Sequence, residues 1–363
     1  MAWKNLMGIA TLEDALAALS SRGPVLSNGL TNHAPMVAEV LATLGRGRDI
    51  GPWLARYAPL LRPWPAALSP LGAADWQNAL GAEGRVGDWR NYLTAELVRG
   101  GAPQLLSQWL PRLLAGSMAA AMHGVIRCAH AVRGWATEPT PEGECELADA
   151  LAYWAATHQT LPRQGSTETP LAVATAVEQL PWLPPEQRRS GGNLTSSLAP
   201  LLQFQPFALH AERVHVEEPM RFTSELTESF ARVFLSNARD RGTSIAFVHA
   251  LTGPAAMRLL LPQLSEEDAR AGAWYAWQAA AALYATFGVA PACRELPPAR
   301  PWPELVEKAI LGADEHAIKF VEACRREAEH AAALGLPNEA YGAAASHAVD
   351  TLRPKDAPDE RAQ

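Results

Sequence analysis

The chain has 363 residues, of which 48% are hydrophobic, and it carries a formal net charge of −7 at pH 7. This length and apolar content predict a globular protein with a substantial core, and the acidic balance offers no sequence-wide attraction to nucleic acid. The N-terminus lacks the basic start and apolar core of a signal peptide, and the weakly polar run LLAGSMAAAMHGVI is too short to span a bilayer. We therefore expect a cytoplasmic protein that binds neither nucleic acid nor membranes.

Helical patterns dominate the chain. The segment TLEDALAALSSRG has Thr11 as a candidate N-cap, acidic residues in its first turn and Gly23 as a stop. The segment APMVAEVLATLGRG has apolar residues at three- and four-residue spacing and ends at Gly45. Similar patterns predict helices near residues 71–81, 86–99, 103–114, 119–135, 146–159, 223–239, 243–262, 266–287, 303–311 and 315–334.

Strand patterns are nearly absent. Only ERVHV at 212–216 alternates apolar and polar residues, and it is short. No fixed-period repeat indicates a solenoid. We therefore expect an all-α protein with a single large multi-helix domain over residues 1–352 and a disordered tail over 353–363. Proline, glycine and serine cluster at breaks near residues 136–144, 181–197 and 295–303.

Two histidines lie seven residues apart in the otherwise small and apolar segment MHGVIRCAHAVRGW. On a helix, His123 and His130 share one face with Arg127 between them, and the neighbouring Gly124 lets another backbone approach, which favours an interior position. The two imidazoles are about 10.5 Å apart along the helix axis, whereas metal–nitrogen bonds measure ~2.1 Å. We therefore do not expect both to bind one ion, and a hydrogen-bonded core histidine is the alternative interpretation of each.

Three further histidines occupy similar settings. His33 follows a Gly/Asn turn and precedes an apolar helix, His249 lies in a predicted apolar helix, and His316 is followed by Lys319 on the same helix face. Taken alone, Lys319 is typical of an exposed helix lysine. Burial beside a metal favours its neutral amine, which can take up carbon dioxide to become an anionic carbamate. Several imidazoles with one oxygen anion suit iron, zinc or manganese.

Other catalytic patterns are missing or weak. The chain has no GxxxxGK, HExxH or GxSxG, and GRGRDIG at 45–51 lacks the spacing and the preceding strand of a dinucleotide-binding loop. Glu212-x-x-His215 and Glu327-x-x-His330 match the pattern of di-iron carboxylate bundles. The first lies outside the predicted helices and the second lies on a charged helix face, so we do not expect a di-iron site.

Five segments together resemble the questin oxidase family, whose fungal members act in aromatic polyketide pathways. The resemblance runs from about residue 25 to about residue 335, and it implies a mostly helical single domain. It also implies oxidative ring cleavage or Baeyer–Villiger-like oxygen insertion on anthraquinone-type substrates, at a mononuclear non-haem iron held by histidines and a carboxylated lysine. The segments are TNHAPMVAEVLATLGR, HGVIRCAHAVRGW, ELADALAYWAA, FVHALTGPAAMRLLLP and DEHAIKFVEAC.

The resemblance also implies a set of site residues. Because His130 belongs to the same family motif as His123, the resemblance leaves open which of the two reaches the metal. We expect the other polar groups on that helix face, His130 or Arg127, to stabilise a phenolate or an oxyanion during catalysis. Carried over position by position, the metal ligands are His33, His123, His249, His316 and Lys319.

The sequence therefore predicts an Fe(II)-dependent oxidoreductase that uses O₂ on a small aromatic substrate, with zinc or manganese as other metals that suit the ligands. One alternative is a metal-free Baeyer–Villiger-type monooxygenase that uses NADPH, although the chain lacks a dinucleotide-binding motif. Another is a non-catalytic helical protein that binds a flat aromatic molecule through some of its 12 tryptophans. The sequence does not indicate an oligomeric state.

Overall fold

Helices account for the regular secondary structure of the computed structural model, which describes residues 3–165, 167–189 and 194–352. Within these residues there are fifteen α-helices, and the β features are limited to three isolated bridges. The segment 212–216 forms a turn and irregular structure rather than a strand. The expected all-α class is confirmed, and the predicted tail over 353–363 lies outside the described residues.

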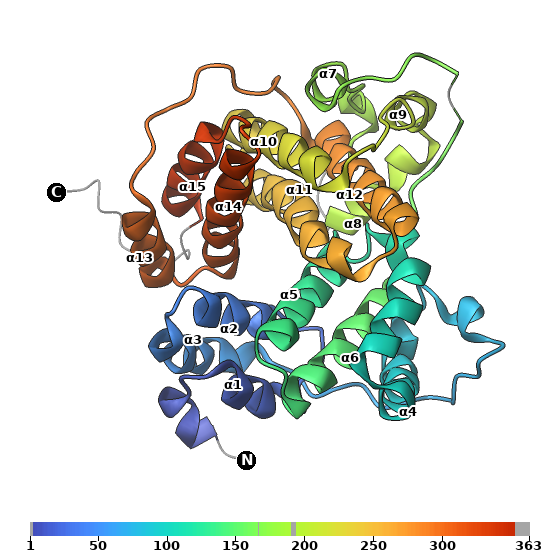
Figure 1. Cartoon of the computed structure of the whole chain (residues 1–363), viewed down its shortest axis with the longest axis vertical. Coiled ribbons are helices and arrows are strands. Elements are labelled where there is room, and N and C mark those ends of the chain that lie inside the picture. The colour runs from blue at the N-terminus through green and yellow to red at the C-terminus, as the bar shows by residue number, and fades with distance from the viewer. Residues whose placement is uncertain (1–2, 166, 190–193, 353–363) are drawn as a thin grey trace.

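The α-helices follow one another with short loops and 3-10 turns between most of them (Figure 1). Their bounds are α1 (Leu12–Leu19), α2 (Ala34–Thr43), α3 (Ile50–Tyr57), α4 (Val86–Leu113), α5 (His123–Thr137), α6 (Pro141–Ala156), α7 (Val173–Glu178), α8 (Leu194–Ser197), α9 (Gln205–Ala211), α10 (Pro219–Asn237), α11 (Arg241–Leu260), α12 (Glu266–Phe287), α13 (Trp302–Gly312), α14 (Glu315–Ala333) and α15 (Glu339–Thr351).

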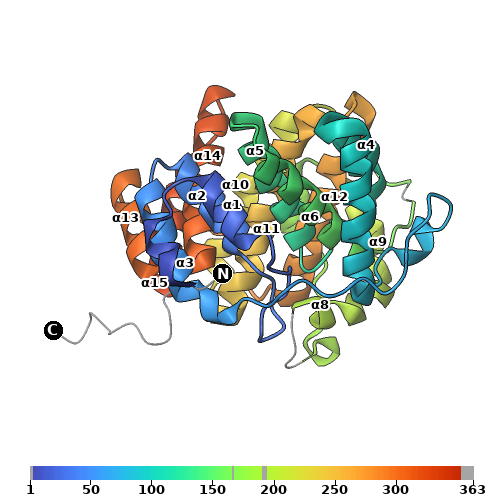
Figure 2. The same ribbon diagram turned by 90° about the horizontal axis from the view of Figure 1, so that it is seen from below.

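Four helices from distant parts of the chain close a ring in the middle of the molecule. Helix α2 packs against α5, α5 against α11, α11 against α14, and α14 back against α2. Helix α6 packs on the outside of α5, with α4 beyond it, while α10 and α12 pack on α11. Figure 1 and Figure 2 both show α5 and α11 between α2 and α14 on one side and α4 and α6 on the other. Side chains that meet between the ring helices therefore come from four separate segments of the sequence.

Local capping determines where two of the ring helices begin. At the start of α11, Asp240 and Thr243 form a reciprocal capping box, in which Asp240 Oδ1 accepts the Thr243 N–H at 2.9 Å. At the start of α14, Asp314 Oδ1 accepts the backbone N–H groups of His316 at 2.9 Å and Ala317 at 3.1 Å. Because each cap fixes the first residue of its helix, it also fixes which side chains the helix turns toward the ring.

Helix α5 begins later than the predicted helix at 119–135. Ala120, Ala121 and Met122 have φ angles of 47°, 56° and 70°, a left-handed conformation that costs roughly 1–2 kcal/mol for each residue with a side chain. The helix therefore starts only at His123. Strain of this kind persists only where the surrounding packing enforces it, and it is concentrated at functional sites.

Several other helix predictions differ from the structure. The helix predicted near 71–81 is wrong, because only the 3-10 turn Trp76–Ala79 forms there between loops that contain proline and glycine. The helices predicted over 86–99 and 103–114 join as α4 across a kink at Gly101, where φ is 74°. The patterns do not indicate α3, α7, α9 or α15, since short or alanine-rich helices that are buried on several sides lack a clear apolar stripe.

One stretch of the described chain, Arg241–Gln263, is long and apolar enough to cross a membrane by length and composition alone. It comprises α11 and the turn that follows, and 89% of its apolar window is buried inside the protein. Helices α5, α10, α12 and α14 surround it. This composition is typical of a helix at the centre of a protein core.

Glycine is required where α5 crosses α6. A Cβ added to Gly124 would lie 2.8 Å from Cδ1 and 2.9 Å from Cγ of Trp154, and 3.0 Å from the Ala119 side chain. Trp154 is fully buried, and its Nε1–H donates to the Gly116 carbonyl at 3.0 Å, so the indole has no room to withdraw. The close approach expected at Gly124 from the sequence is thus present, next to His123.

We expect Gly124→Ala to destabilise the fold, because overpacking costs about 1–3 kcal/mol and outweighs the gain of up to ~1 kcal/mol in helix propensity. Urea unfolding measures the change in the free energy of unfolding. The matched control is Gly312→Ala, since a Cβ at that helical glycine meets nothing within 4 Å. Equal stabilities of the two variants would contradict the packing explanation.

Candidate metal centre

Each helix of the central ring brings one histidine to a common point. His33 directly precedes α2, His123 begins α5, His249 lies within α11 and His316 lies in the first turn of α14. All four are buried, with exposed fractions of 7% or less. The Nε2 atom of His123 lies 3.0 Å from Nε2 of His33 and 3.1 Å from Nε2 of His249.

The fourth imidazole closes the group. The ring of His316 lies 4.7 Å from that of His33 and 5.4 Å from that of His249, measured between centroids. Possible ligand nitrogens of His33, His123 and His316 all lie within 4.8 Å of one another. The structure thus brings together the four histidines named as ligands by resemblance, and it places His123 rather than His130 in the group. Whether they bind a metal remains a prediction.

The loop before α2 fixes the position of His33. Asn32 Oδ1 accepts the Ala34 N–H at 2.9 Å, and Asn32 Nδ2 donates to the Gly23 carbonyl at 2.9 Å. The backbone N–H of His33 donates to the Tyr57 hydroxyl at 3.0 Å. The bonds to Asn32 Oδ1 and the Tyr57 hydroxyl satisfy the backbone N–H groups of Ala34 and His33 at the start of α2, and they fix the position of the His33 backbone.

The strained turn before α5 sets the protonation state of His123. Its Nδ1 lies 2.6 Å from the Ala120 carbonyl oxygen, so Nδ1–H donates and the Nε2 lone pair is directed toward the other histidines. Metal-bound histidines are commonly oriented in this way, by a carbonyl that accepts from the outer ring nitrogen. The left-handed conformation of Ala120 to Met122 therefore serves to aim one imidazole.

Asp314 holds the helix that carries His316 and Lys319. Asp314 Oδ1 caps α14. Asp314 Oδ2 accepts a hydrogen bond from the Arg241 guanidinium at 2.7 Å, and this bond ties the start of α14 to the start of α11. Carboxylate oxygens of Asp314 and Glu315 both lie 3.6 Å from His316 Nδ1, which favours a proton on that outer nitrogen.

The electrostatics of the cluster favour neutral imidazoles. Burial lowers the pKa of His33, His123 and His249 well below the ordinary value for histidine. Positive charge on Lys319 and on the neighbouring histidines lowers the pKa of these three further. Neutral imidazoles with free lone pairs are the form that binds metal ions.

The nitrogen geometry fits a metal ion better than a hydrogen-bond network. The Nε2 atom of His123 has one lone pair and accepts one hydrogen bond, yet two other Nε2 atoms approach it within 3.1 Å. Two nitrogens bonded at ~2.1 Å and at right angles to one cation lie about 3.0 Å apart. A cation would satisfy all the converging lone pairs, so the donor set fits the mononuclear metal that the family resemblance implies.

Lys319 lies one turn along α14 from His316 and is 3% exposed. Burial lowers the pKa of its amine to about 8, although the charges of Glu315 and Asp314 partly oppose this. Among the described residues, Lys319 Nζ contacts the Met36 sulfur at 4.0 Å. The exposed-lysine interpretation is therefore wrong, and the amine sits in a dry, weakly polar environment beside the histidines.

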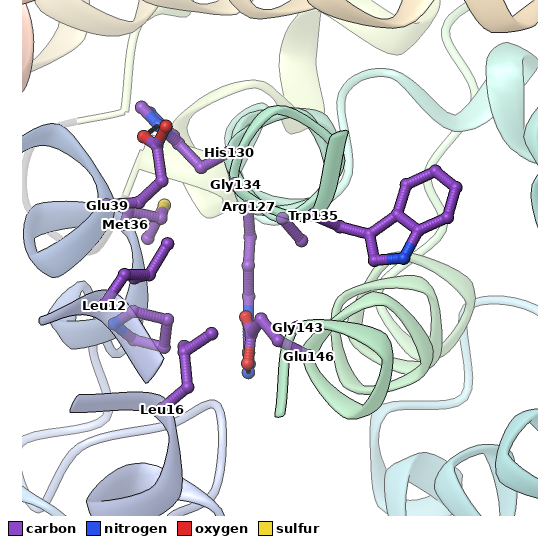
Figure 3. Close-up of a pocket in the computed structure, with 12 residues that line it drawn as sticks. Leu12, Leu16, Met36, Glu39, Arg127, His130, Gly134, Trp135, Gly143 and Glu146 are labelled. Atoms are coloured by element: carbon purple, nitrogen blue, oxygen red, sulfur yellow. Dashed lines mark hydrogen bonds and ion pairs between the residues drawn. The ribbon is translucent and has the colours of Figure 1, made fainter. Parts of the chain in front are cut away.

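His130 and Arg127 lie outside the histidine group. His130 Nδ1 is 2.6 Å from Glu39 Oε2, while Arg127 makes a two-bond ion pair with Glu146 at 2.7 and 2.8 Å. Figure 3 shows Glu39 turned toward His130 and Arg127 extended away from them toward Glu146. Both residues line a pocket of about 10 Å³, which has room for about one water molecule. Met36 lines the same pocket and separates it from Lys319.

The sequence interpretation missed the charged partners of the site. Glu39 is the single acid in the apolar helix α2, and it is 3% exposed. It accepts hydrogen bonds from Arg133 at 2.6 and 2.7 Å in addition to its contact with His130. An acid in the middle of the otherwise apolar APMVAEVLAT, and a second basic residue three positions after His130, are the signals that could have indicated this pairing.

The E-x-x-H patterns do not form a metal site in the described residues. Glu327 pairs with Arg258 at 2.8 Å, and Glu212 pairs with Arg163 at 2.9 Å. Neither glutamate belongs to a group of residues close enough to hold a metal ion. Each glutamate therefore has an arginine partner, and Glu327 is fully buried rather than on a solvent-exposed helix face.

A comparison with models of protein families agrees with the fold and the histidine group. The model described as questin oxidase-like matches residues 60–324. The chain belongs to this family. A comparison with curated proteins finds no match. The matched range includes His123, His249, His316 and Lys319, whereas His33 lies before it and is joined to the group only by the fold.

We expect the Glu39 pair to make stability depend on pH. Burial alone would raise the pKa of Glu39, but Arg133 and the hydrogen bond with His130 lower it to about 2. A carboxyl with a lowered pKa stabilises the fold above its ordinary pKa, and this stabilisation, about 3 kcal/mol, is lost as the pH falls from about 4.5 to about 2. The measurement is the free energy of unfolding of wild type and Glu39→Gln across this range, where their difference should shrink.

The control for this prediction is Glu266→Gln, because Glu266 forms an exposed surface pair with Arg270. Its difference from wild type should be small at every pH. A wild-type advantage over Glu39→Gln that stays constant down to pH 2 would show that Glu39 is not stabilised as its anion.

Proposed function

We propose that the protein is a non-haem, metal-dependent oxidoreductase that uses O₂ to cleave or insert oxygen into the ring of a small aromatic molecule, with iron as the metal. The family indicates an oxidoreductase. The observation that carries the finer proposal is the convergence of three Nε2 atoms at 3.0 and 3.1 Å, with a fourth imidazole and a buried lysine beside them. Polar groups of this kind are a costly way to line an apolar core unless they bind something.

The chain's own residues would bind the metal and control protons around it. His33, His123, His249 and His316 would supply ring nitrogens from the four ring helices. Bound iron would make the otherwise spin-forbidden reaction of O₂ with an electron-rich ring accessible and would polarise oxygen groups as a Lewis acid. The Ala120 carbonyl holds the His123 ring through Nδ1, and Asp314 holds the His316 backbone at the start of α14.

Of the two residues predicted to stabilise a phenolate, the contacts favour His130. Both carboxylate oxygens of Glu146 bind the Arg127 guanidinium, which directs its charge away from His130. Glu39 holds His130 through the ring nitrogen Nδ1. In this arrangement His130 Nε2 can accept a proton from a phenol, and Glu39 stabilises the imidazolium that results. A three-ring substrate needs far more space than the adjoining pocket, so substrate binding requires Met36 or its neighbours to move.

We also propose that Lys319 carries a carboxyl group when the metal is bound. The amine is buried, lies beside the imidazoles and has no carboxylate partner within hydrogen-bonding distance among the described residues. The ammonium first loses one proton, and the neutral amine nitrogen then bonds to the carbon of CO₂ with loss of a second proton, so that a cation becomes an oxygen anion with two protons released. An oxygen anion together with imidazoles is a ligand set that iron accepts.

The metal proposal predicts near-stoichiometric iron in protein purified without chelator or a histidine tag, and its loss from His33→Ala and His249→Ala. Elemental mass spectrometry measures the metal content, and O₂ uptake with hydroxyanthraquinones measures turnover. The matched control is His210→Ala, because His210 is a buried histidine bonded to the Ala176 carbonyl at 2.8 Å and lies outside the group. Folded ligand variants that keep their iron and turnover would show that the proposed ligand set is wrong.

The same assays separate the alternative functions. Cleavage that incorporates both oxygen atoms consumes no reductant, whereas insertion of one atom also forms water and consumes two electrons. Consumption of NADPH coupled to substrate, by protein without metal, would favour the metal-free monooxygenase. Quenching of tryptophan fluorescence by the aromatic ligand without O₂ uptake would favour a binding protein.

The lysine proposal predicts a carbamate ¹³C resonance when the metal-loaded protein is equilibrated with ¹³C-bicarbonate. Lys319→Met should abolish this resonance and weaken metal binding, because the oxygen ligand is lost. Lys319→Arg is the control that keeps a positive charge and cannot form the carbamate. The metal for this measurement is Zn²⁺, because paramagnetic iron would broaden the resonance of a carbamate bound to it, and a wild-type protein with bound Zn²⁺ and no carbamate resonance would overturn this part of the proposal.

A further inference from the structure

Arg133 joins three of the four helices that carry the histidines. It lies on α5, donates from Nε and Nη2 to both oxygens of Glu39 on α2 at 2.6 and 2.7 Å, and donates from Nη1 to Glu322 on α14 at 2.5 Å. Glu39 and Glu322 are 3% and 4% exposed. One planar guanidinium thus holds two buried carboxylates on opposite edges, a geometry that a lysine ammonium cannot reproduce.

The ion pairs continue to the fourth helix. Arg326 donates to Glu322 at 3.1 Å and to Glu327 at 2.7 Å, and it also donates to the Ala255 carbonyl of α11 at 3.0 Å. Arg258 of α11 completes the chain by binding Glu327 at 2.8 Å. The three glutamates and three arginines cancel in charge, so they can stay ionised inside the protein.

This chain of ion pairs connects the same four helices that carry the histidines, and it comes nearest to the ligands on α14. Glu322 lies three residues after Lys319 and six after His316 on α14, while Arg133 lies ten residues after His123 on α5. A helix rises about 1.5 Å per residue, so a slip of one residue at Glu322 would move the side chains of His316 and Lys319 by a similar amount. A displacement of about 1 Å is enough to spoil a binding site that requires fixed geometry.

We infer that Arg133 is a positioning residue for the histidine group, because it fixes the register of α2, α5 and α14 by binding Glu39 and Glu322 together. The inference rests on the proposed metal site and adds to it a residue that touches no ligand. Removal of residues that orient metal ligands typically weakens metal binding by about 10–100-fold.

The test uses Co²⁺, whose visible absorption reports the number and geometry of its ligands. Arg133→Lys keeps the charge but not the two-sided geometry, and we expect it to weaken Co²⁺ binding by about 10-fold or more and to change the visible spectrum of the bound ion. A second variant, Glu39→Gln/Arg133→Met/Glu322→Gln, removes the bridge without leaving Arg133's two direct partners as unpaired anions. We expect it to show the same two changes.

The matched control is Arg90→Lys. Arg90 also donates two hydrogen bonds to one carboxylate, Asp149, but it ties α4 to α6, neither of which carries a histidine of the group. It should keep the Co²⁺ spectrum and an affinity within about twofold of wild type. Variants of Arg133 that are folded by circular dichroism and keep the wild-type spectrum and affinity would overturn the inference. Wild-type protein that binds no Co²⁺ or iron would instead overturn the metal site itself.

Discussion

The closure of α2, α5, α11 and α14 into a ring forces polar chemistry into the interior of this protein. Four imidazoles and an amine lie where apolar side chains would ordinarily pack, and each polar atom there requires a partner. Nearby groups supply some of these partners. The Ala120 carbonyl accepts a hydrogen bond from His123 Nδ1, and Asp314 accepts one from the backbone at the start of α14. Within the described part of the chain, the converging Nε2 atoms have no such partner other than one another, and this is the physical reason for expecting a cation between them.

A buried polar centre also depends on the helices that carry it keeping their register. Apolar packing alone tolerates small shifts, because dispersion contacts are non-directional and side chains repack. Directional bonds do not tolerate them, and the ion pairs from Glu39 through Arg133 to Glu322 lie between the same helices as the histidines. The turn before His123 also requires fixed surroundings, because neighbouring contacts hold it in a left-handed backbone conformation that residues with side chains disfavour.

The sequence indicates the helical class and most long helices, because their caps and apolar stripes are local features. It also identifies the histidines as candidates and argues from helix rise that His123 and His130 do not both bind one ion. Spacing could not show that His33 meets His249, since 216 positions separate them and only the ring of helices joins them (249 − 33). The partners of His130 were hidden for the same reason, because Glu39 comes from another helix.

Charge balance explains why Lys319 matters to such a centre. Imidazoles add no negative charge, whereas a divalent cation in a dry interior is stabilised by anions close to it. Among the described residues nearby, Arg133 and Arg326 already neutralise Glu39 and Glu322. Arg241 likewise occupies Asp314, which lies on the outer side of His316. Glu315 also lies on the outer side of His316. A carbamate on Lys319 would add an oxygen anion at the buried amine beside the histidines, so the metal and the modified lysine would each supply the charge that makes burial of the other favourable.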